Sequence, residues 1–327
     1  MKTQDFFRFF RSLNVLVAGA LGGGILALMF SPYFPVHCQS NVMTFFCAPE
    51  FSVMFFLMGI LSSLMAIALF PGWGIFAWLL KTHMTENQQD YRSKAWMRLA
   101  TVVIVIAVIS YADLKSLNQF SPEAQSRWDA DVPNGVQLIL LIHAVYFIFA
   151  ILPYLLGMFL LSALIRNIGT KADTDVNNLA SDSIFGLIRP LLLYRRMLQL
   201  FLLVSGIMLS LFPLSIVELR SILIKIDPLI GSLYPASYAI FQSLIFTMLL
   251  LFIYVPAYLE LTVVGRRFRD VIYPLCSLDT LKDTMEKRKS LDNLLQTEGT
   301  FITNLSSSML TLSPLISSLL VLLGIKI

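Results

Sequence analysis

The chain has 327 residues, of which 57% are hydrophobic and only 13% are charged, and its mean hydropathy is +0.76. Soluble domains have about a quarter of their residues charged, so this composition excludes a water-soluble globular protein. The formal net charge of +4 does not indicate a nucleic-acid partner, because the basic residues lie beside apolar runs, where membrane topology explains them. We therefore expect a single domain, residues 1–327, embedded in a lipid bilayer.

Apolar runs long enough to cross about 30 Å of hydrocarbon predict an all-α, polytopic transmembrane helical bundle of about seven spans. The first run follows Lys2, Arg8 and Arg11 and lacks a small-residue cleavage site, so it is expected to stay in the protein as an anchor. The expected spans are residues 13–30, 51–80, 97–112, 136–165, 197–217, 238–263 and 301–324.

Lysine and arginine are unevenly divided among the segments between these spans. If the N-terminus is cytoplasmic, 19 of the 24 basic residues fall on the cytoplasmic side and 5 on the outer side. Basic residues are retained in the cytoplasm during membrane insertion. The sequence thus predicts a plasma (inner) membrane protein with the N-terminus inside, the C-terminus outside, and cytoplasmic loops at 81–96, 166–196 and 264–300.

Two of these loops have features of their own. Residues 166–196 carry polar side chains followed by an apolar patch at 184–188. This pattern fits either an amphipathic or re-entrant helix, or a polar linker running into an extended fifth helix. Residues 277–298 place leucines and Met285 at helical spacing among charged residues, which predicts a surface helix.

Three expected spans each contain a proline closely followed by an aromatic residue, and each precedes a basic loop. The pairs are Pro71 with Trp73, Pro153 with Tyr154, and Pro256 with Tyr258. The pattern suggests three related hairpins with interrupted helices, as in transporters, where a carbonyl freed by proline can face a substrate or an ion. Chance is the alternative, since proline is frequent in membrane helices.

Ionisable side chains within the spans are the other candidates for a pathway, because charge is costly in hydrocarbon. Glu260 lies six residues before Arg266. It is expected to pair across helices, to line a proton or cation path, or to reach the interface. For His143 in the fourth span, the alternatives are a hydrogen-bonded packing residue and a titrating gate.

Cysteines and glycines near the N-terminus carry two further predictions. Cys38 and Cys47 share the first outer loop, where an oxidising compartment favours a disulfide between them. A metal pair is disfavoured, because His37 is the only histidine nearby. Gly19 and Gly23 form a small-xxx-small face, which allows close helix packing either within the chain or in a homo-oligomer.

Catalytic motifs are missing from the sequence. It contains no Walker-type glycine loop, no His-Glu-x-x-His and no Gly-x-Ser-x-Gly, so we expect no enzyme activity, metal or cofactor. Two functions remain open. One is a transporter or channel for a small solute or ion. The other is a non-transporting membrane component, such as an assembly factor, sensor or defence effector, that engages a partner protein through its cytoplasmic loops.

Overall fold

The computed structural model describes residues 49–86, 134–175, 181–226, 236–274, 281–295 and 305–322. These residues form helices and no strands, as expected for an all-α protein. The helices are α3 (Pro49–Glu86), α6 (Asn134–Asp175), α7 (Ser181–Ile226), α9 (Ala236–Ile272), α10 (Leu281–Leu295) and α11 (Leu305–Leu322). The expected spans 13–30 and 97–112 lie outside the described residues.

Four of these helices are long and apolar enough to cross a membrane. The apolar stretches are Phe56–Thr82 in α3, Val145–Thr170 in α6, Gly186–Ile222 in α7 and Ile240–Ile272 in α9. At 1.5 Å per residue, α6 and α7 measure about 63 and 69 Å, roughly twice the hydrocarbon thickness. Helices of this length project from a bilayer. Helix α11 coincides with the expected span 301–324 but is not among the four, so the count of seven spans stays a prediction.

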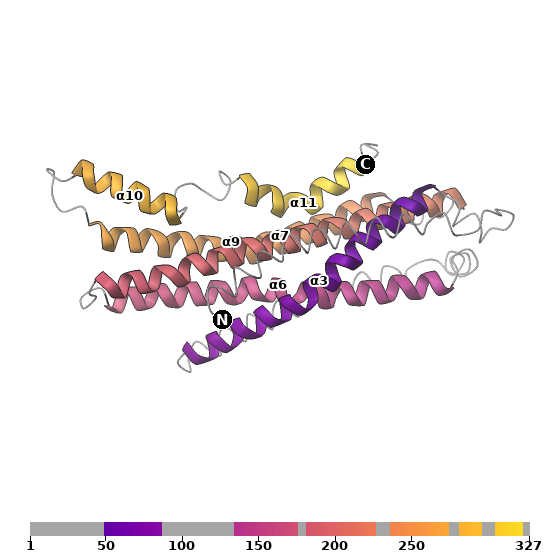
Figure 1. The fold of residues 1–327 in the computed structure, drawn as a ribbon. Helices are drawn as coiled ribbons and strands as arrows, with labels where there is room; N and C mark the ends of the chain where they lie inside the picture. Colours follow the sequence, from indigo (N-terminus) through magenta and orange to yellow (C-terminus); the bar gives the residue numbers. More distant parts are fainter. Residues whose placement is uncertain are drawn as a thin grey trace.

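The long helices run alongside one another, with α7 opposite in direction to α3, α6 and α9, and α3 crosses the others obliquely (Figure 1). Helices α3, α6 and α9 end at the end of the bundle where α7 begins and α10 lies. We call this the basic end, because most described lysines and arginines fall there. They are Lys81, Arg166, Arg189, Arg195, Arg196, Arg266, Arg267, Arg269, Lys282, Lys287, Arg288 and Lys289.

Segments expected as loops are largely helical at the basic end. Helix α6 continues to Asp175 and α7 begins at Ser181, which corresponds to the extended fifth helix among the two alternatives for 166–196. Helix α9 continues to Ile272, and α10 lies within the expected surface helix 277–298. Pro190 is accommodated inside α7, because neighbouring helices can supply partners for the backbone groups that a proline frees.

Helix α6 is the most enclosed of the four apolar helices, and its glycines lie where its neighbours approach. A Cβ atom added to Gly157 would overlap the ring of Phe201 in α7, and one added to Gly169 would lie 2.8 Å from Val264 Cγ2 in α9. Such gaps are narrower than van der Waals contact. Side chains at these two positions would therefore push α7 and α9 away from α6.

Helix α11 packs on α7 through small polar residues. A Cβ atom added to Gly206 would lie 2.8 Å from the carbonyl oxygen of Leu310. The hydroxyls of Ser210 and Ser313 are hydrogen-bonded at 2.8 Å, and Ser317 donates to the Ser210 carbonyl at 3.4 Å. Gly206 and Ser210, like Ser313 and Ser317, have small-xxx-small spacing, which lets two backbones approach closely in a membrane.

One face of α9 exposes large apolar side chains along most of the helix. They are Phe241, Leu244, Met248, Phe252, Leu259 and Val263. Spacings of three, four and seven residues place them on one side, and we call them the apolar stripe. At 1.5 Å per residue the stripe is about 33 Å long, close to the thickness of a bilayer core. It fits a surface turned toward lipid.

Candidate functional site

The proline segments of α3 and α6 lie against each other. Pro153 has no amide N–H, so the carbonyl of Phe149, four residues earlier, loses its helical donor. The indole Nε1–H of Trp73 donates a hydrogen bond to this carbonyl oxygen at 3.1 Å. Trp73 is the aromatic residue that follows the proline of α3, so one proline-aromatic pair completes the backbone hydrogen bonding of the other.

A second bond runs in the opposite direction. The buried hydroxyl of Tyr154 donates at 2.7 Å to the carbonyl oxygen of Ala68, in the turn before Pro71. The Tyr154 ring meets Phe201 edge-on at 5.5 Å and lies against Gly72, where an added Cβ would be 2.7 Å from its Cε2. The two bonds fasten α3 to α6 at the points where proline weakens each helix.

The third proline-aromatic pair makes different contacts. Pro256 lies among the exposed residues of α9, on the side of the apolar stripe. The Tyr258 ring stacks on Tyr254 at 5.9 Å, and both tyrosines lie close enough to Arg195 of α7 to interact electrostatically. The three pairs are thus not used alike, and an internal repeat stays a prediction.

Glu260 is paired with Arg166 across the α6–α9 contact. Its Oε1 accepts hydrogen bonds from the Nε and a terminal nitrogen of Arg166, the former at 2.9 Å. The two side chains are 24% and 36% exposed. A charge near the hydrocarbon edge needs such a partner. Pairing across helices was one of three roles expected for Glu260, and a role in a pathway stays a prediction.

Arg195 is buried where α7 meets the end of α10. Only 7% of this residue is exposed, and its guanidinium donates to the carbonyl oxygen of Leu295, the last residue of α10. Carbonyls at a helix C-terminus lack helical donors and carry partial negative charge. Arg195 therefore caps α10, and the interaction offsets part of the cost of burying a guanidinium.

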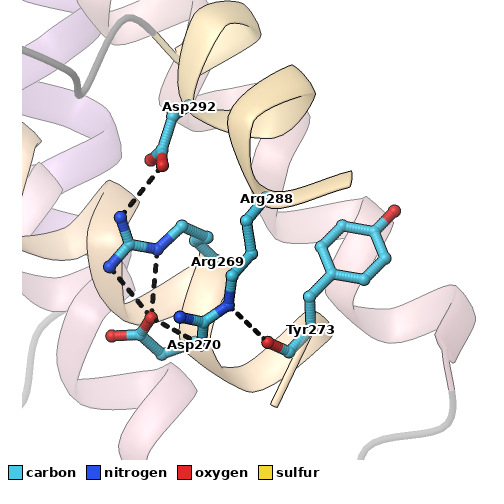
Figure 2. A network of polar contacts seen from close by, with 5 residues as sticks. All are labelled: Arg269, Asp270, Tyr273, Arg288 and Asp292. Atoms are coloured by element: carbon cyan, nitrogen blue, oxygen red, sulfur yellow. Dashed lines mark hydrogen bonds and ion pairs between the residues drawn. The ribbon is translucent and has the colours of Figure 1, made fainter. Parts of the chain in front are cut away.

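Ion pairs fasten α10 to the end of α9 (Figure 2). Arg269 donates at 2.9 Å to Asp292, whose side chain is 6% exposed, and at 3.0 Å to Asp270. Arg288 of α10 bonds the same carboxylate oxygen of Asp270 at 3.0 Å and donates to the carbonyl of Tyr273 at 2.7 Å. We call these five residues the clamp.

The clamp lies where α9 ends and the chain turns back. Tyr273 follows the last residue of α9. The carbonyl oxygen of Tyr273 accepts a hydrogen bond from Arg288, which lies in α10 after the turn. Leu295 and Leu291 add apolar contacts to the bundle core. The α9–α10 hairpin is therefore held by both charge and burial. On the outer side of α10, Lys287 bonds Asp283 at 2.6 Å, which raises the pKa of Lys287; this exposed pair contributes little to stability.

Several expected site residues have no described surroundings. Cys38, Cys47, Gly19 and Gly23 lie outside the described residues, and His143 is placed only as a backbone position in α6. Sequence analysis missed the clamp, although Arg269 next to Asp270 and Arg288 four residues before Asp292 are visible in the sequence. It also missed the small-xxx-small spacing of Gly206 and Ser210 in α7, a spacing that was noted only for Gly19 and Gly23.

The described residues contain no group of three or more His, Cys, Asp or Glu side chains placed to hold a metal ion. What they do contain at the basic end is a set of ion pairs that join helices. No protein-family model matches the chain, and no curated protein or solved structure matches it either. A functional assignment therefore depends on the chemistry of this end of the bundle.

Proposed function

We propose that the protein is a non-transporting membrane component that presents the α9–α10 hairpin, on the cytoplasmic side of the plasma (inner) membrane, to a partner protein. The observation that carries the proposal is the clamp. It holds a charged helix in one orientation against the end of α9, through Arg269 with Asp292 and Arg288 with Asp270. A linker that only joined two spans would need no such fastening.

The pattern of satisfied groups within the bundle supports this function over transport. The carbonyl that Pro153 frees accepts the Trp73 indole N–H, and the carboxylate of Glu260 accepts the Arg166 guanidinium. Groups engaged in this way have to release a partner before they can bind a solute. The proline of α6 and Glu260, which suggested a transport pathway, can therefore be explained by structural roles.

The outward side of α10 supports a protein partner. Met285 and Leu294 are more than half exposed, although most of the other residues of α10 are polar or charged. Large exposed apolar side chains with charged neighbours are typical of protein interfaces. A partner that covers these side chains would bind a helix that is already formed. Little conformational entropy would therefore be lost on binding, and the affinity would be correspondingly higher.

Site-specific photo-cross-linking in native membranes tests the proposal. A photoreactive residue at Met285 or Leu294 should give a discrete protein adduct, whereas one at Phe252 on the apolar stripe should give only lipid adducts. Asp292→Asn should abolish the α10 adduct because it releases the helix, and Asp283→Asn, an exposed matched control, should preserve it. The absence of a protein adduct at both α10 positions would refute the proposal.

Transport of a small solute or ion is the second candidate, favoured by polar atoms inside the spans. The hydroxyls of Ser205 in α7 and Thr247 in α9 are buried and have no hydrogen-bond partner among the described residues. Buried polar groups in such a state are rare and are commonly satisfied by water or an ion. Proteoliposomes provide the test: a proton or cation flux that Thr247→Val abolishes, without loss of stability, would favour this function.

A further inference from the structure

Two buried hydroxyl groups of the bundle differ from the others. In these helices a side-chain hydroxyl commonly donates to the carbonyl oxygen four residues earlier, as in Ser62, Ser63, Thr82, Ser210, Ser215, Ser221 and Thr262. The hydroxyls of Ser205 and Thr247 are buried and have no hydrogen-bond partner among the described residues. Because a buried polar group without a partner is costly, these two hydroxyls require a partner from outside their own helices.

Ser205 lies where α7 meets both α9 and α11. It shares a face of α7 with Phe212, seven residues later, and the Phe212 ring lies 6.0 Å from that of Phe246 in α9. The residue after Ser205 is Gly206, where an added Cβ atom would lie 2.8 Å from the carbonyl oxygen of Leu310 in α11. Ser205 is therefore next to a junction of three helices.

Thr247 lies on the side of α9 that meets α7. It shares a face with Tyr254, seven residues later, which lies close enough to Arg195 of α7 to interact electrostatically. Helices α7 and α9 run in opposite directions (Figure 1), and both hydroxyls lie between this contact and the phenylalanine ring contact. On α11, the fully buried Thr311 follows Leu310. The three helices thus bring hydroxyl groups to one level inside the bundle.

We propose that an ordered water molecule is bound between Ser205 and Thr247, at the junction of α7, α9 and α11. A hydroxyl group can both donate and accept a hydrogen bond, as water can, so one water molecule satisfies both side chains. Buried water molecules in proteins make about three hydrogen bonds to polar groups that otherwise have no partner. The inference depends only on the packing of these helices and is independent of the proposed partner protein.

The charge of the surroundings favours a neutral ligand over a cation. Along α7 and α9 the acidic residues nearest to Ser205 and Thr247 are Glu218 and Glu260, each 13 residues away. This separation corresponds to about 20 Å of helix. Helix α11, Leu305–Leu322, has no acidic residue. A cation held only by hydroxyl oxygens inside the bundle would lack a counter-charge, which is costly in a membrane.

Crystallography of the full chain in lipidic cubic phase, at a resolution that shows ordered solvent, tests the site directly. We expect a density peak at about 2.7–3.2 Å from both Ser205 Oγ and Thr247 Oγ1. Side chains packed together without a peak, or the two hydroxyls bonded directly to each other, would overturn the proposal.

Denaturant-induced unfolding in detergent tests the same water molecule through its energetics. Ser205→Ala and Thr247→Val should each raise the equilibrium constant for unfolding about fivefold, because the water loses a partner. Without a bound water, each change would remove an unsatisfied polar group and lower that constant. The effect of the double variant should fall short of the product of the single effects by about fivefold, because the second change removes a water that is already lost.

A matched control uses a threonine of α9 that has a partner in its own helix. Thr262 donates to the Tyr258 carbonyl, so Ser205→Ala with Thr262→Val should give the product of the two single effects within about twofold. Unfolding in sodium, potassium and choline chloride should give equal stability. Stabilising single variants, multiplicative effects of Ser205→Ala and Thr247→Val, or stabilisation by sodium or potassium over choline would overturn the water site.

Discussion

Replacing Glu260 with glutamine removes the counter-charge of Arg166 while preserving side-chain size. At an effective dielectric constant of about 20, two unit charges about 4 Å apart attract by ~4 kcal/mol. Desolvation opposes most of that attraction, and exposures of 24% and 36% allow water to screen the pair. Glutamine also retains a hydrogen-bond acceptor. We therefore expect Glu260→Gln to lower the free energy of unfolding by about 1–2 kcal/mol.

A double-mutant cycle with Arg166→Gln separates this pair from other effects. The assay is denaturant-induced unfolding of the detergent-solubilised protein, followed by intrinsic fluorescence. We expect a coupling energy of about 1 kcal/mol, and no measurable change for Glu286→Gln, a matched control exposed on α10. If the stability losses of the two single variants sum to the loss of the double variant within about 0.5 kcal/mol, an interaction between Glu260 and Arg166 is refuted. Unchanged stability with a lost flux would instead favour transport.

Three further changes test the helix contacts and the topology. Tyr154→Phe should lower the free energy of unfolding by about 1 kcal/mol, because the Ala68 carbonyl loses a donor; equal stability would show that this bond contributes nothing. Gly206→Ala should destabilise by about 1–3 kcal/mol in the same assay, because the new Cβ meets backbone of α11. Gly74→Ala, which has open space around it, should be neutral or slightly stabilising; similar losses at both glycines would contradict the packing argument. An alkaline phosphatase fusion after Ile327 should be active outside the cytoplasm, and an inactive fusion would contradict the predicted orientation.

The partners of single side chains were only partly predictable. Sequence analysis singled out Glu260 because charge is costly in hydrocarbon, and pairing across helices was one of three roles expected for it. It could not identify Arg166, which is 94 residues away along the chain and approaches only because α6 and α9 pack together at Gly169. The same holds for Trp73 and Phe149, whose bond depends on how α3 crosses α6. Proline predicts that a carbonyl is freed, but the donor comes from another helix.

The sequence by itself determined that the described part of the chain consists of helices, four of them long and apolar. Apolar length is a local property of the chain, and a helix satisfies its own backbone hydrogen bonds in lipid. It also determined the concentration of basic residues at one end of those helices. The tertiary structure alone decided that α6, α7 and α9 continue into segments expected as loops and that α10 folds back on α9. The continued helices pack on neighbours that bury Leu295 and partly bury Ile272. The clamp joins residues that come close only after the chain has turned between α9 and α10. Local patterns specify which segments are helical, whereas contacts between distant segments specify which charges meet.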